Sequence, residues 1–324
     1  MYSFDQLVDL THRSVAALKL PAEPKLLYQP IQYTLDAGGK RIRPLLALGC
    51  CGLFTDDVTL AVPAAMGIEV FHNFTLLHDD IMDKADRRRG RETVHVKWDE
   101  NVAILSGDAM LIYAYALFSQ SKPEQMPVLF PVFNRIVMGV CEGQSYDMVY
   151  ETRNDVTVEE YLKMIELKTA ILIAGSARIG AVTGGADAGT AQNIYEAGMN
   201  LGMAFQLQDD LLDTYGDPEV FGKNLGGDIA SNKKTFLLIK ALELSQGAVK
   251  KELLDLISTE PADRQEKFEA VKTIYDETGA RALAESLRDD YYGKGMRIID
   301  QLPVKETRKE PLREVCKLLV QRDK

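Results

Sequence analysis

The apolar residues of this chain recur at intervals of three and four positions along most of its length. This spacing places them on one face of an α-helix, whereas the alternation of apolar and polar residues that marks a strand is nearly absent. Breaks rich in proline, glycine and polar residues separate the periodic stretches. They fall at 21–24, 38–44, 63, 88–90, 123–131, 184–189, 216–228 and 260–264. We therefore predict an all-α protein of about ten or more helices packed as a bundle.

One helix start is well marked, because Thr157 and Glu160 have the spacing of a capping box. No glycine- or serine-rich linker and no step in composition divides the chain, and no repeat of solenoid length occurs. We predict a single all-helical domain spanning residues 1–324.

Composition narrows the functional classes. With 46% hydrophobic residues the chain can bury a sizeable core, and its net charge of −10 and pI of about 5.1 argue against nucleic acid as a partner. Its four cysteines lack the spacing of a metal site or of a redox motif, which is typical of buried thiols in a reducing compartment.

The sequence does not favour a membrane protein. Residues 1–13 lack the apolar core of a signal peptide. The most apolar stretches, 102–118 and 171–182, are interrupted by Asp108 and Arg178, so we expect no good membrane span. We expect a soluble, cytoplasmic protein that is not integral to a membrane.

The most informative feature is an acidic motif, Asp-Asp-x-x-Asp, that occurs twice, at 79–83 and 209–213. Each copy closes an apolar helical stretch. On a helix, the first and last aspartates of the motif lie about 40° apart and about 6 Å along the axis, so their carboxylates can share bound ions. Ligand sets made only of oxygen suit Mg²⁺ held between carboxylates and a phosphate substrate.

Basic residues accompany both motifs. Arginines occupy 87–89, lysines occupy 223, 233 and 234, and the stretch 38–44 reads Gly-Gly-Lys-Arg-Ile-Arg-Pro. In that stretch we expect the glycines to bend the backbone and all three cations to face a ligand. Arginine forks match diphosphate oxygens, and lysine adds a mobile charge. No Walker or Gly-x-Gly-x-x-Gly loop occurs, so a nucleotide is not the obvious polyanion.

Taken in order, these strings resemble the trans-type isoprenyl diphosphate synthases, also called polyprenyl synthetases. The matching strings are 38–44, 76–83 with Arg88, Arg89 and Gly90, Gly143-Gln144, Lys168-Thr169, 205–213, and 223–228 with Lys233, Lys234 and Thr235. The resemblance implies an isoprenoid synthase-type helical bundle around a central cavity, and a homodimer. It also implies a reaction in which an allylic diphosphate loses pyrophosphate and alkylates isopentenyl diphosphate, after which a proton leaves.

The resemblance also implies roles for individual residues. The expected metal ligands, for about three Mg²⁺ ions held with the allylic diphosphate, are Asp79, Asp83, Asp209, Asp210 and Asp213, with Asp80 beside them. The residues expected to bind the same diphosphate are Arg88, Lys168, Thr169, Gln206, Lys223 and Lys233. Those expected to take part in catalysis are Asp79, Asp80, Asp83, Lys168, Asp209, Asp210 and Lys233. Lys40, Arg43, His72 and Arg89 are expected to bind isopentenyl diphosphate without metal.

Product length is expected to depend on residues just upstream of the first motif. By resemblance, the aromatic residues Phe71 and Phe74 form the cavity floor, and the product is short, of fifteen or twenty carbons with twenty favoured. On an ideal helix, however, Phe74 points away from Asp79, so Thr75 is a further candidate for the floor.

Two alternatives remain open from the sequence. A terpene cyclase shares the fold and the first motif but usually has a mixed second motif, whereas 209–213 is intact here. A regulatory subunit of a heteromeric synthase commonly loses one acidic motif, and this chain keeps both.

Overall fold

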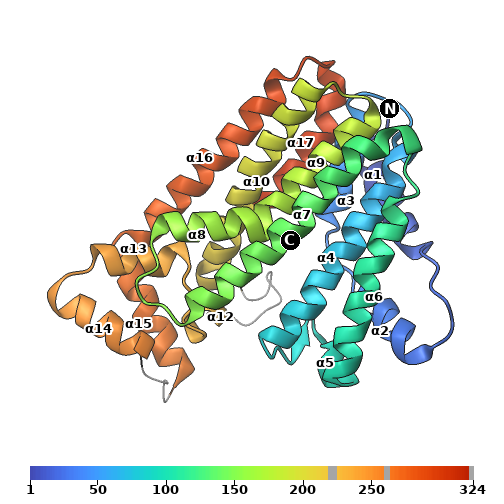
Figure 1. Cartoon of the computed structure of the whole chain (residues 1–324). Helices are drawn as coiled ribbons and strands as arrows, with labels where there is room; N and C mark the ends of the chain where they lie inside the picture. Colours follow the sequence, from blue (N-terminus) through green and yellow to red (C-terminus); the bar gives the residue numbers. More distant parts are fainter. Residues whose placement is uncertain (218–224, 259–262, 321–324) are drawn as a thin grey trace. The chain divides into compact units, whose positions relative to one another are not determined.

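The computed structural model describes residues 1–217, 225–258 and 263–320 (Figure 1). Contacts divide the described residues into two compact units. Unit 1 comprises 1–134, 175–195 and 300–318, and unit 2 comprises 135–174, 196–299 and the residues that follow 318. The prediction of an all-α protein is confirmed, and the prediction of one domain over 1–324 stays a prediction.

Unit 1 is formed mainly by the N-terminal half of the chain. Its elements are α1 (Phe4–Ala16), α2 (Lys25–Leu35), α3 (Ile42–Gly52), η1 (Val58–Ala61), α4 (Val62–Met82), β1 (Arg87–Arg88), β2 (Arg91–Glu92), α5 (Val94–Lys97), α6 (Glu100–Phe118), η2 (Pro123–Gln125) and most of α17 (Glu306–Val320). The two short strands pair as an antiparallel hairpin, and the described residues contain no other strand.

Unit 2 is formed mainly by the C-terminal half. Its elements are α8 (Val158–Ile165), the π-helical turn η3 (Glu166–Ala170), α12 (Gly227–Ala230), α13 (Phe236–Leu244), α14 (Gly247–Ser258), α15 (Arg264–Glu277) and nearly all of α16 (Ala280–Gln301). Three further helices have residues in both units; these are α7 (Met126–Glu151), α9 (Ile171–Gly184) and α10 (Ala188–Tyr215).

The helix that carries the first acidic motif, α4, packs along α6 in unit 1 (Figure 1). Two glycines permit the close approach. A Cβ on Gly67 of α4 would lie 2.8 Å from the carbonyl oxygen of Ala114, and a Cβ on Gly107 of α6 would lie 2.2 Å from Nε2 of His78. His78 is the residue immediately before the motif, so this packing fixes the end of α4 at which the aspartates lie.

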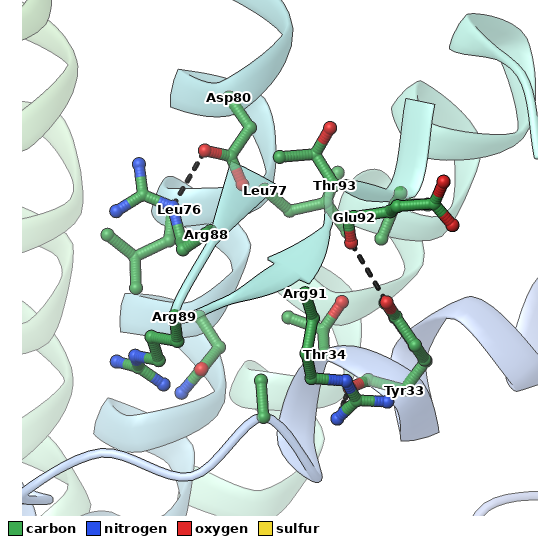
Figure 2. Close-up of a pocket in the computed structure, with 13 residues that line it drawn as sticks. Tyr33, Thr34, Leu76, Leu77, Asp80, Arg88, Arg89, Arg91, Glu92 and Thr93 are labelled. Atoms are coloured by element: carbon green, nitrogen blue, oxygen red, sulfur yellow. Dashed lines mark hydrogen bonds and ion pairs between the residues drawn. The ribbon is translucent and has the colours of Figure 1, made fainter. Parts of the chain in front are cut away.

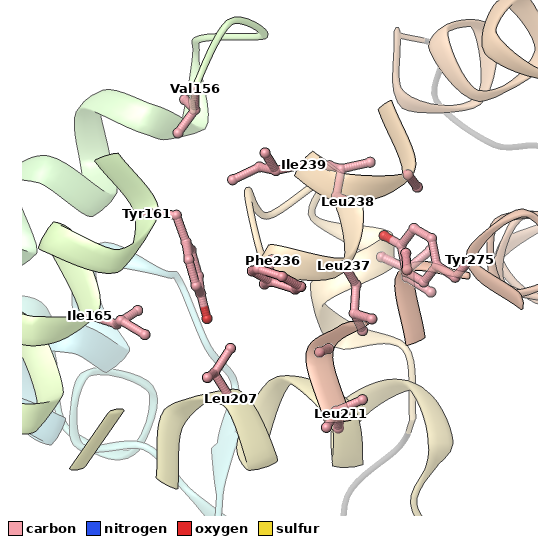
Figure 3. Packing of buried hydrophobic residues seen from close by; sticks show 14 of the residues in the cluster. Val156, Tyr161, Ile165, Leu207, Leu211, Phe236, Leu237, Leu238, Ile239 and Tyr275 are labelled. Atoms are coloured by element: carbon pink, nitrogen blue, oxygen red, sulfur yellow. The ribbon is translucent and has the colours of Figure 1, made fainter. Parts of the chain in front are cut away.

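A buried hydrophobic cluster supports the second acidic motif in unit 2. Leu207 and Leu211 of α10 belong to it, together with Tyr161 of α8 and residues 236–239 of α13 (Figure 3). Because Leu207 and Leu211 alternate with Asp209 and Asp213 around α10, burying the leucines turns these two aspartates away from the cluster.

One helix start confirms the sequence-based expectation and one expected break does not. Thr157 and Glu160 form the expected capping box, with reciprocal backbone hydrogen bonds of 3.2 and 2.9 Å. The break expected over 123–131 is shorter, because α7 begins at Met126 and contains Pro131. Pro131 lies in the second turn of α7, where it removes one backbone hydrogen bond, and the helix continues through it.

The expectation that no segment would qualify as a membrane span was wrong on length and composition. The helical stretches Val58–Met82 and Glu100–Phe118 are both long and apolar enough to cross a membrane, because one or two charges do not offset so many apolar residues. The most apolar window of Val58–Met82 is 67% buried and that of Glu100–Phe118 is 39% buried. Core helices of soluble proteins also meet this criterion, so the finding is weak evidence for a span.

Candidate functional site

The first acidic motif lies at the C-terminal end of α4. Asp79 and Asp80 occupy its last turn, and Asp83 caps the helix with its N–H bonded to the carbonyl of Asp79 at 2.8 Å. Lys84 follows in the left-handed conformation, and the N–H of Ala85 bonds to the carbonyl of Asp80. This is a Schellman ending, which satisfies the last carbonyls of the helix and keeps Asp79 and Asp83 one turn apart.

The two neighbouring aspartates of this motif differ in environment. Asp80 is buried and accepts a hydrogen bond from Nε of Arg88 at 2.7 Å, whereas Oδ2 of Asp79 lies 3.9 Å from the Arg88 guanidinium. Burial raises the pKa of Asp80, although Arg88 opposes the shift. Asp83 is exposed. The carboxylates of Asp79 and Asp83 are therefore the more accessible pair for a metal ion.

A tight hairpin presents the arginines that follow this motif. Arg88 pairs with Arg91 across the hairpin, and the turn residues Arg89 and Gly90 both have positive φ. This backbone matches the twist of a two-residue hairpin. Arg88 thereby contacts Asp80, while Arg89 donates a hydrogen bond to the carbonyl of Gly38. Figure 2 shows these side chains around a cavity of about 30 Å³ that Arg88, Arg89 and Asp80 help to line.

A cluster of guanidinium groups surrounds His72 of α4. Nη1 of Arg43 lies 3.1 Å from Nε2 of His72. Burial lowers the pKa of His72 well below its ordinary value, and Arg43, Arg89, Arg88 and Arg41 lower it further. A guanidinium can only donate, so Nε2 must accept, and His72 is neutral with its proton on Nδ1. The structure therefore brings Arg43 and Arg89 close to His72, as the sequence-based grouping expects, and Lys40 lies exposed on the adjoining loop.

Arg41 departs from the expectation that all three cations of 38–44 face a ligand. It is 7% exposed, and its guanidinium donates to Oε1 of Glu69 and to the carbonyl of Leu35, both at 2.5 Å. The expectation was wrong for this residue because its backbone is left-handed, with φ of 48°, and turns the side chain into the interior.

The second acidic motif, on α10 of unit 2, also contains one buried aspartate. Asp210 accepts hydrogen bonds from the Tyr161 hydroxyl at 2.5 Å and from the Gln206 amide at 2.9 Å. Burial and the nearby Asp228 raise the pKa of Asp210 to about 8. Gln206 in turn accepts a hydrogen bond from Thr169 at 2.8 Å. Gln206 thus joins Asp210 to Thr169, and the sequence assigned both Gln206 and Thr169 to substrate binding.

Asp213 accepts two backbone hydrogen bonds from residues just before and within α12. Its Oδ2 accepts the N–H of Asp228 at 2.9 Å, and its carbonyl accepts the N–H of Gly226 at 2.7 Å. Asp228 lies 4.0 Å from Nζ of Lys233. Burial raises the pKa of Asp228 to about 6, with Lys233 opposing and Asp213 and Asp209 adding to the shift. Lys223 lies outside the described residues.

Lys168 is positioned by a π-helical turn between α8 and α9. The turn, Glu166–Ala170, places Lys168 Nζ 2.5 Å from Oδ2 of Asp147 on α7. Burial raises the pKa of Asp147, but Lys233 and Lys168 outweigh it and hold the pKa below its usual value. Asp147 is therefore a charged partner of both lysines, and π-helical turns frequently occur at functional sites.

Sequence reasoning missed Asp147, Tyr161 and Asp228 as site residues. Asp147 comes one helical turn after Gly143, and Asp228 ends the string 223–228, so both lay within or beside strings that carried the resemblance. Tyr161 gave no such signal, because its position beside Asp210 follows only from the fold.

The donor atoms suit magnesium. Among the residues that the structure describes, no three histidine, cysteine, aspartate or glutamate side chains converge as a metal site. Mg²⁺ is usually bound through one or two carboxylates together with substrate phosphates, so a site completed by its substrate needs no such convergence. The accessible, oxygen-only pairs Asp79 with Asp83 and Asp209 with Asp213 fit that mode of binding.

Comparison with known proteins shows the family to which the chain belongs. The sequence profile of the family described as "Polyprenyl synthetase" matches residues 24–274. The geranylgeranyl diphosphate synthase of Methanosarcina mazei is 40% identical over 281 residues, covering 86% of this chain and 85% of that protein. The geranylfarnesyl diphosphate synthase of Natronomonas pharaonis is 35% identical over 323 residues, covering 94% and 92%.

Solved structures of two related proteins have the same fold as this chain. A crystal structure of a geranylgeranyl pyrophosphate synthase superposes with a TM-score of 0.94 at 42% identity and covers 99% of both chains. A polyprenyl synthase from Caulobacter crescentus CB15, crystallised with calcium and isoprenyl diphosphate, superposes with a TM-score of 0.88 at 28% identity and covers 99% of this chain and 98% of its own.

Proposed function

Because the chain belongs to the polyprenyl synthetase family and is an isoprenyl diphosphate synthase, we propose that it condenses an allylic diphosphate with isopentenyl diphosphate to give geranylgeranyl diphosphate. The observation that carries the proposal is the guanidinium cluster around a neutral His72, about two to three turns before the accessible carboxylates of α4. Guanidinium groups can bind one diphosphate directly, and the nearby carboxylates can bind another through a metal ion.

We propose that Lys168, Lys233, Thr169, Gln206 and Arg88 hold the allylic diphosphate. Its C–O bond breaks to give an allylic cation and pyrophosphate, and the cations stabilise the charge that develops on the leaving group. Asp147 supports this role, because its contact with Lys168 and its proximity to Lys233 hold both ammonium groups near one point.

We propose that Lys40, Arg43, His72 and Arg89 hold isopentenyl diphosphate. Its double bond attacks the allylic cation, and the resulting cation loses a proton, for which the released pyrophosphate is a sufficient acceptor. His72 is neutral and keeps its proton on Nδ1, so it can donate a hydrogen bond to a phosphate oxygen without repelling Arg43.

Divalent metal use belongs to the family, and we propose Mg²⁺ with Asp79, Asp83, Asp209 and Asp213 as ligands. When bound, the metal neutralises the diphosphate and lowers the barrier to its departure. Asp80 and Asp210 are assigned here to positioning rather than to direct binding, because Arg88 occupies one and Tyr161 with Gln206 occupies the other.

We propose twenty carbons as the product length. The two relatives described above are named for products of twenty and twenty-five carbons. Of the two lengths expected from the sequence, fifteen and twenty carbons, twenty is therefore the better supported. Below the first motif, Phe74 packs against His78 and Phe71, and Phe71 packs against Phe133. This aromatic stack is the proposed floor for the growing chain, and Thr75 lies one turn before Asp79 on α4.

We also propose a cytoplasmic homodimer. Large apolar side chains lie exposed on α6 and the start of α7, where Leu105 is 60% exposed, Ile112 is 70% exposed and Phe130 is 42% exposed. Phe130 packs against Tyr115 of α6, so these exposed side chains lie on adjoining helices, and apolar surface gathered in this way marks an interface in soluble proteins.

One assay tests the reaction. The chain is incubated with Mg²⁺, isopentenyl diphosphate and each short allylic diphosphate, and the product is hydrolysed and its chain length measured. A linear all-trans product of twenty carbons supports the proposal. A hydrocarbon ring would instead identify a cyclase, and no turnover with any pair of substrates would identify a regulatory subunit.

A further inference from the structure

A buried ion pair lies directly beneath the cationic loop 38–44. Arg41 and Glu69 have side chains that are 5% and 2% exposed, and Nη1 of Arg41 lies 2.5 Å from Oε1 of Glu69. The other arm of the same guanidinium donates to the carbonyl of Leu35, the last residue of α2. One side chain therefore joins the loop to the end of α2 and to the middle of α4.

Glu69 is itself held in place from α4. The side-chain amide of Asn73 donates to Oε1 of Glu69 at 2.7 Å and to its carbonyl at 2.8 Å. Asn73 follows His72 directly, so the turn of α4 that orients the glutamate also carries the histidine that Arg43 contacts. The two arginines of the loop are thus fixed to successive residues of one helix, Arg41 through Glu69 and Asn73, and Arg43 through His72.

The loop backbone depends on this anchor. Gly38, Gly39 and Arg41 all have positive φ, of 77°, 115° and 48°. Glycine adopts such values freely, but an arginine does so only where its surroundings hold it. The interior contacts of Arg41 supply that hold, and they leave Lys40 exposed before it and Arg43 beside His72 after it.

The charge of Arg41 is balanced within the protein. Glu69 lies at hydrogen-bond distance from its guanidinium, both are buried, and a buried charge requires such a partner. Arg41 therefore has no direct part in binding an external anion, although it is a cation in the middle of a cationic loop.

We propose that Arg41, Glu69 and Asn73 form a positioning group that sets Lys40 and Arg43 in the geometry that binds isopentenyl diphosphate. The inference rests on the proposed function. It adds that affinity for the second diphosphate depends on an ion pair that touches no substrate.

The experiment separates positioning from stability. Removing one partner of a buried ion pair leaves an uncompensated charge and destabilises strongly, whereas replacing both by apolar residues is often neutral for stability. Arg41→Met, Glu69→Leu and the double variant are compared with the parent for urea unfolding and for KM and kcat with each substrate. Turnover by the parent with both substrates comes first, so that failure of the proposed function is seen separately.

The expected result is that both single variants lose stability and the double variant recovers it. In the double variant the KM for isopentenyl diphosphate nevertheless stays raised by about ten-fold or more, as expected for misplaced binding groups, while the KM for the allylic diphosphate changes less than about two-fold. A stable double variant with the parent's KM for isopentenyl diphosphate would overturn the proposal.

Two further variants keep the test decisive. Leu312→Ala removes a side chain of unit 1 that is 1% exposed and packs near Gly49, so it should lower stability without changing either KM. Asn73→Ala keeps both charges and removes only the hydrogen bonds that orient Glu69. It should raise the KM for isopentenyl diphosphate in the same direction but less. If Leu312→Ala raises that KM as much as Arg41→Met does, or if Asn73→Ala leaves it unchanged, positioning is excluded.

Discussion

At the scale of single residues, the two acidic motifs have the same pattern of burial, because only the second aspartate of each is buried. In each, the second aspartate is buried, with Asp80 6% exposed and Asp210 4% exposed, and each is held by a neighbouring side chain. The sequence indicates that the carboxylates within each motif lie near one another. It does not indicate which of two adjacent carboxylates turns inward, because that depends on partners from other elements, Arg88 for Asp80 and Tyr161 for Asp210.

His72 makes stability depend on pH. Its pKa is lowered in the folded state, so below its ordinary value of about 6.5 the unfolded chain binds a proton that the folded chain does not. Stability is therefore present above pH 6.5 and is lost as pH falls, by at most about 1.4 kcal/mol per pH unit from this group. Urea unfolding of the parent and of His72→Gln between pH 7 and 5 checks this. The parent should lose more stability than the variant, and parallel losses would contradict the assignment of a neutral His72.

Asp147 should matter for catalysis although no motif named it. Asp147→Asn removes the carboxylate that holds Lys168 and attracts Lys233, so the two ammonium groups separate. We expect kcat to fall about ten-fold or more in steady-state assays, because small displacements of charged groups have large effects on rate. Asp155→Asn, which loses only a surface pair with Arg153, is the matched control and should leave kcat unchanged. Equal kcat values for the two variants would exclude the role of Asp147.

Phe74 should limit product length. Phe74→Ala removes a ring that packs against Phe71 and His78, which opens space below the first motif. We expect products longer than those of the parent when chain length is measured after hydrolysis. An unchanged distribution of products would instead place the floor at Thr75 or Phe71.

At the scale of secondary-structure elements, the sequence predicted regular helices better than their irregularities. The three-and-four spacing and the capping box at Thr157 were sufficient for the helices themselves. The π-helical turn at Glu166–Ala170 left no local signal, because an extra residue in a helical turn is stabilised by its neighbours in the fold. The left-handed Arg41 and Lys84 were equally hidden, since neither is a glycine or an asparagine.

The π-helical turn depends on a glycine of α7. A Cβ on Gly143 would lie 2.2 Å from the backbone nitrogen of Lys168, and backbone cannot move aside as a flexible side chain can. We expect Gly143→Ala to lower the free energy of unfolding by about 1–3 kcal/mol, as overpacking does, and to lower kcat by displacing Lys168.

Gly293→Ala is the control for this prediction. It introduces the same methyl group in α16, where the nearest atom is the flexible end of Arg297, so stability should be unchanged or slightly higher. Should Gly143→Ala unfold like the parent in urea and retain its kcat, the close packing would have no functional part.

At the scale of the whole molecule, the exposed apolar side chains of α6 and the start of α7 form the surface on which we propose that the homodimer is built. Ile112→Glu places a charge in the middle of this face, and burying that charge would be unfavourable in a dimer. We expect the parent to sediment as a dimer and Ile112→Glu as a monomer. Leu283→Glu, on the exposed side of α16, should not change sedimentation. A monomeric parent would contradict the proposed homodimer.

The proposed chemistry depends above all on magnesium bound by the accessible carboxylates together with a diphosphate. A crystal structure with Mg²⁺ and a non-reactive allylic diphosphate analogue measures this directly. We expect ions ligated by Asp79, Asp83, Asp209 and Asp213 on the analogue's phosphate oxygens, with Asp80 still bonded to Arg88 and Asp210 to Tyr161. An analogue bound away from these aspartates, or bound with no ion on them, would contradict the proposed mechanism.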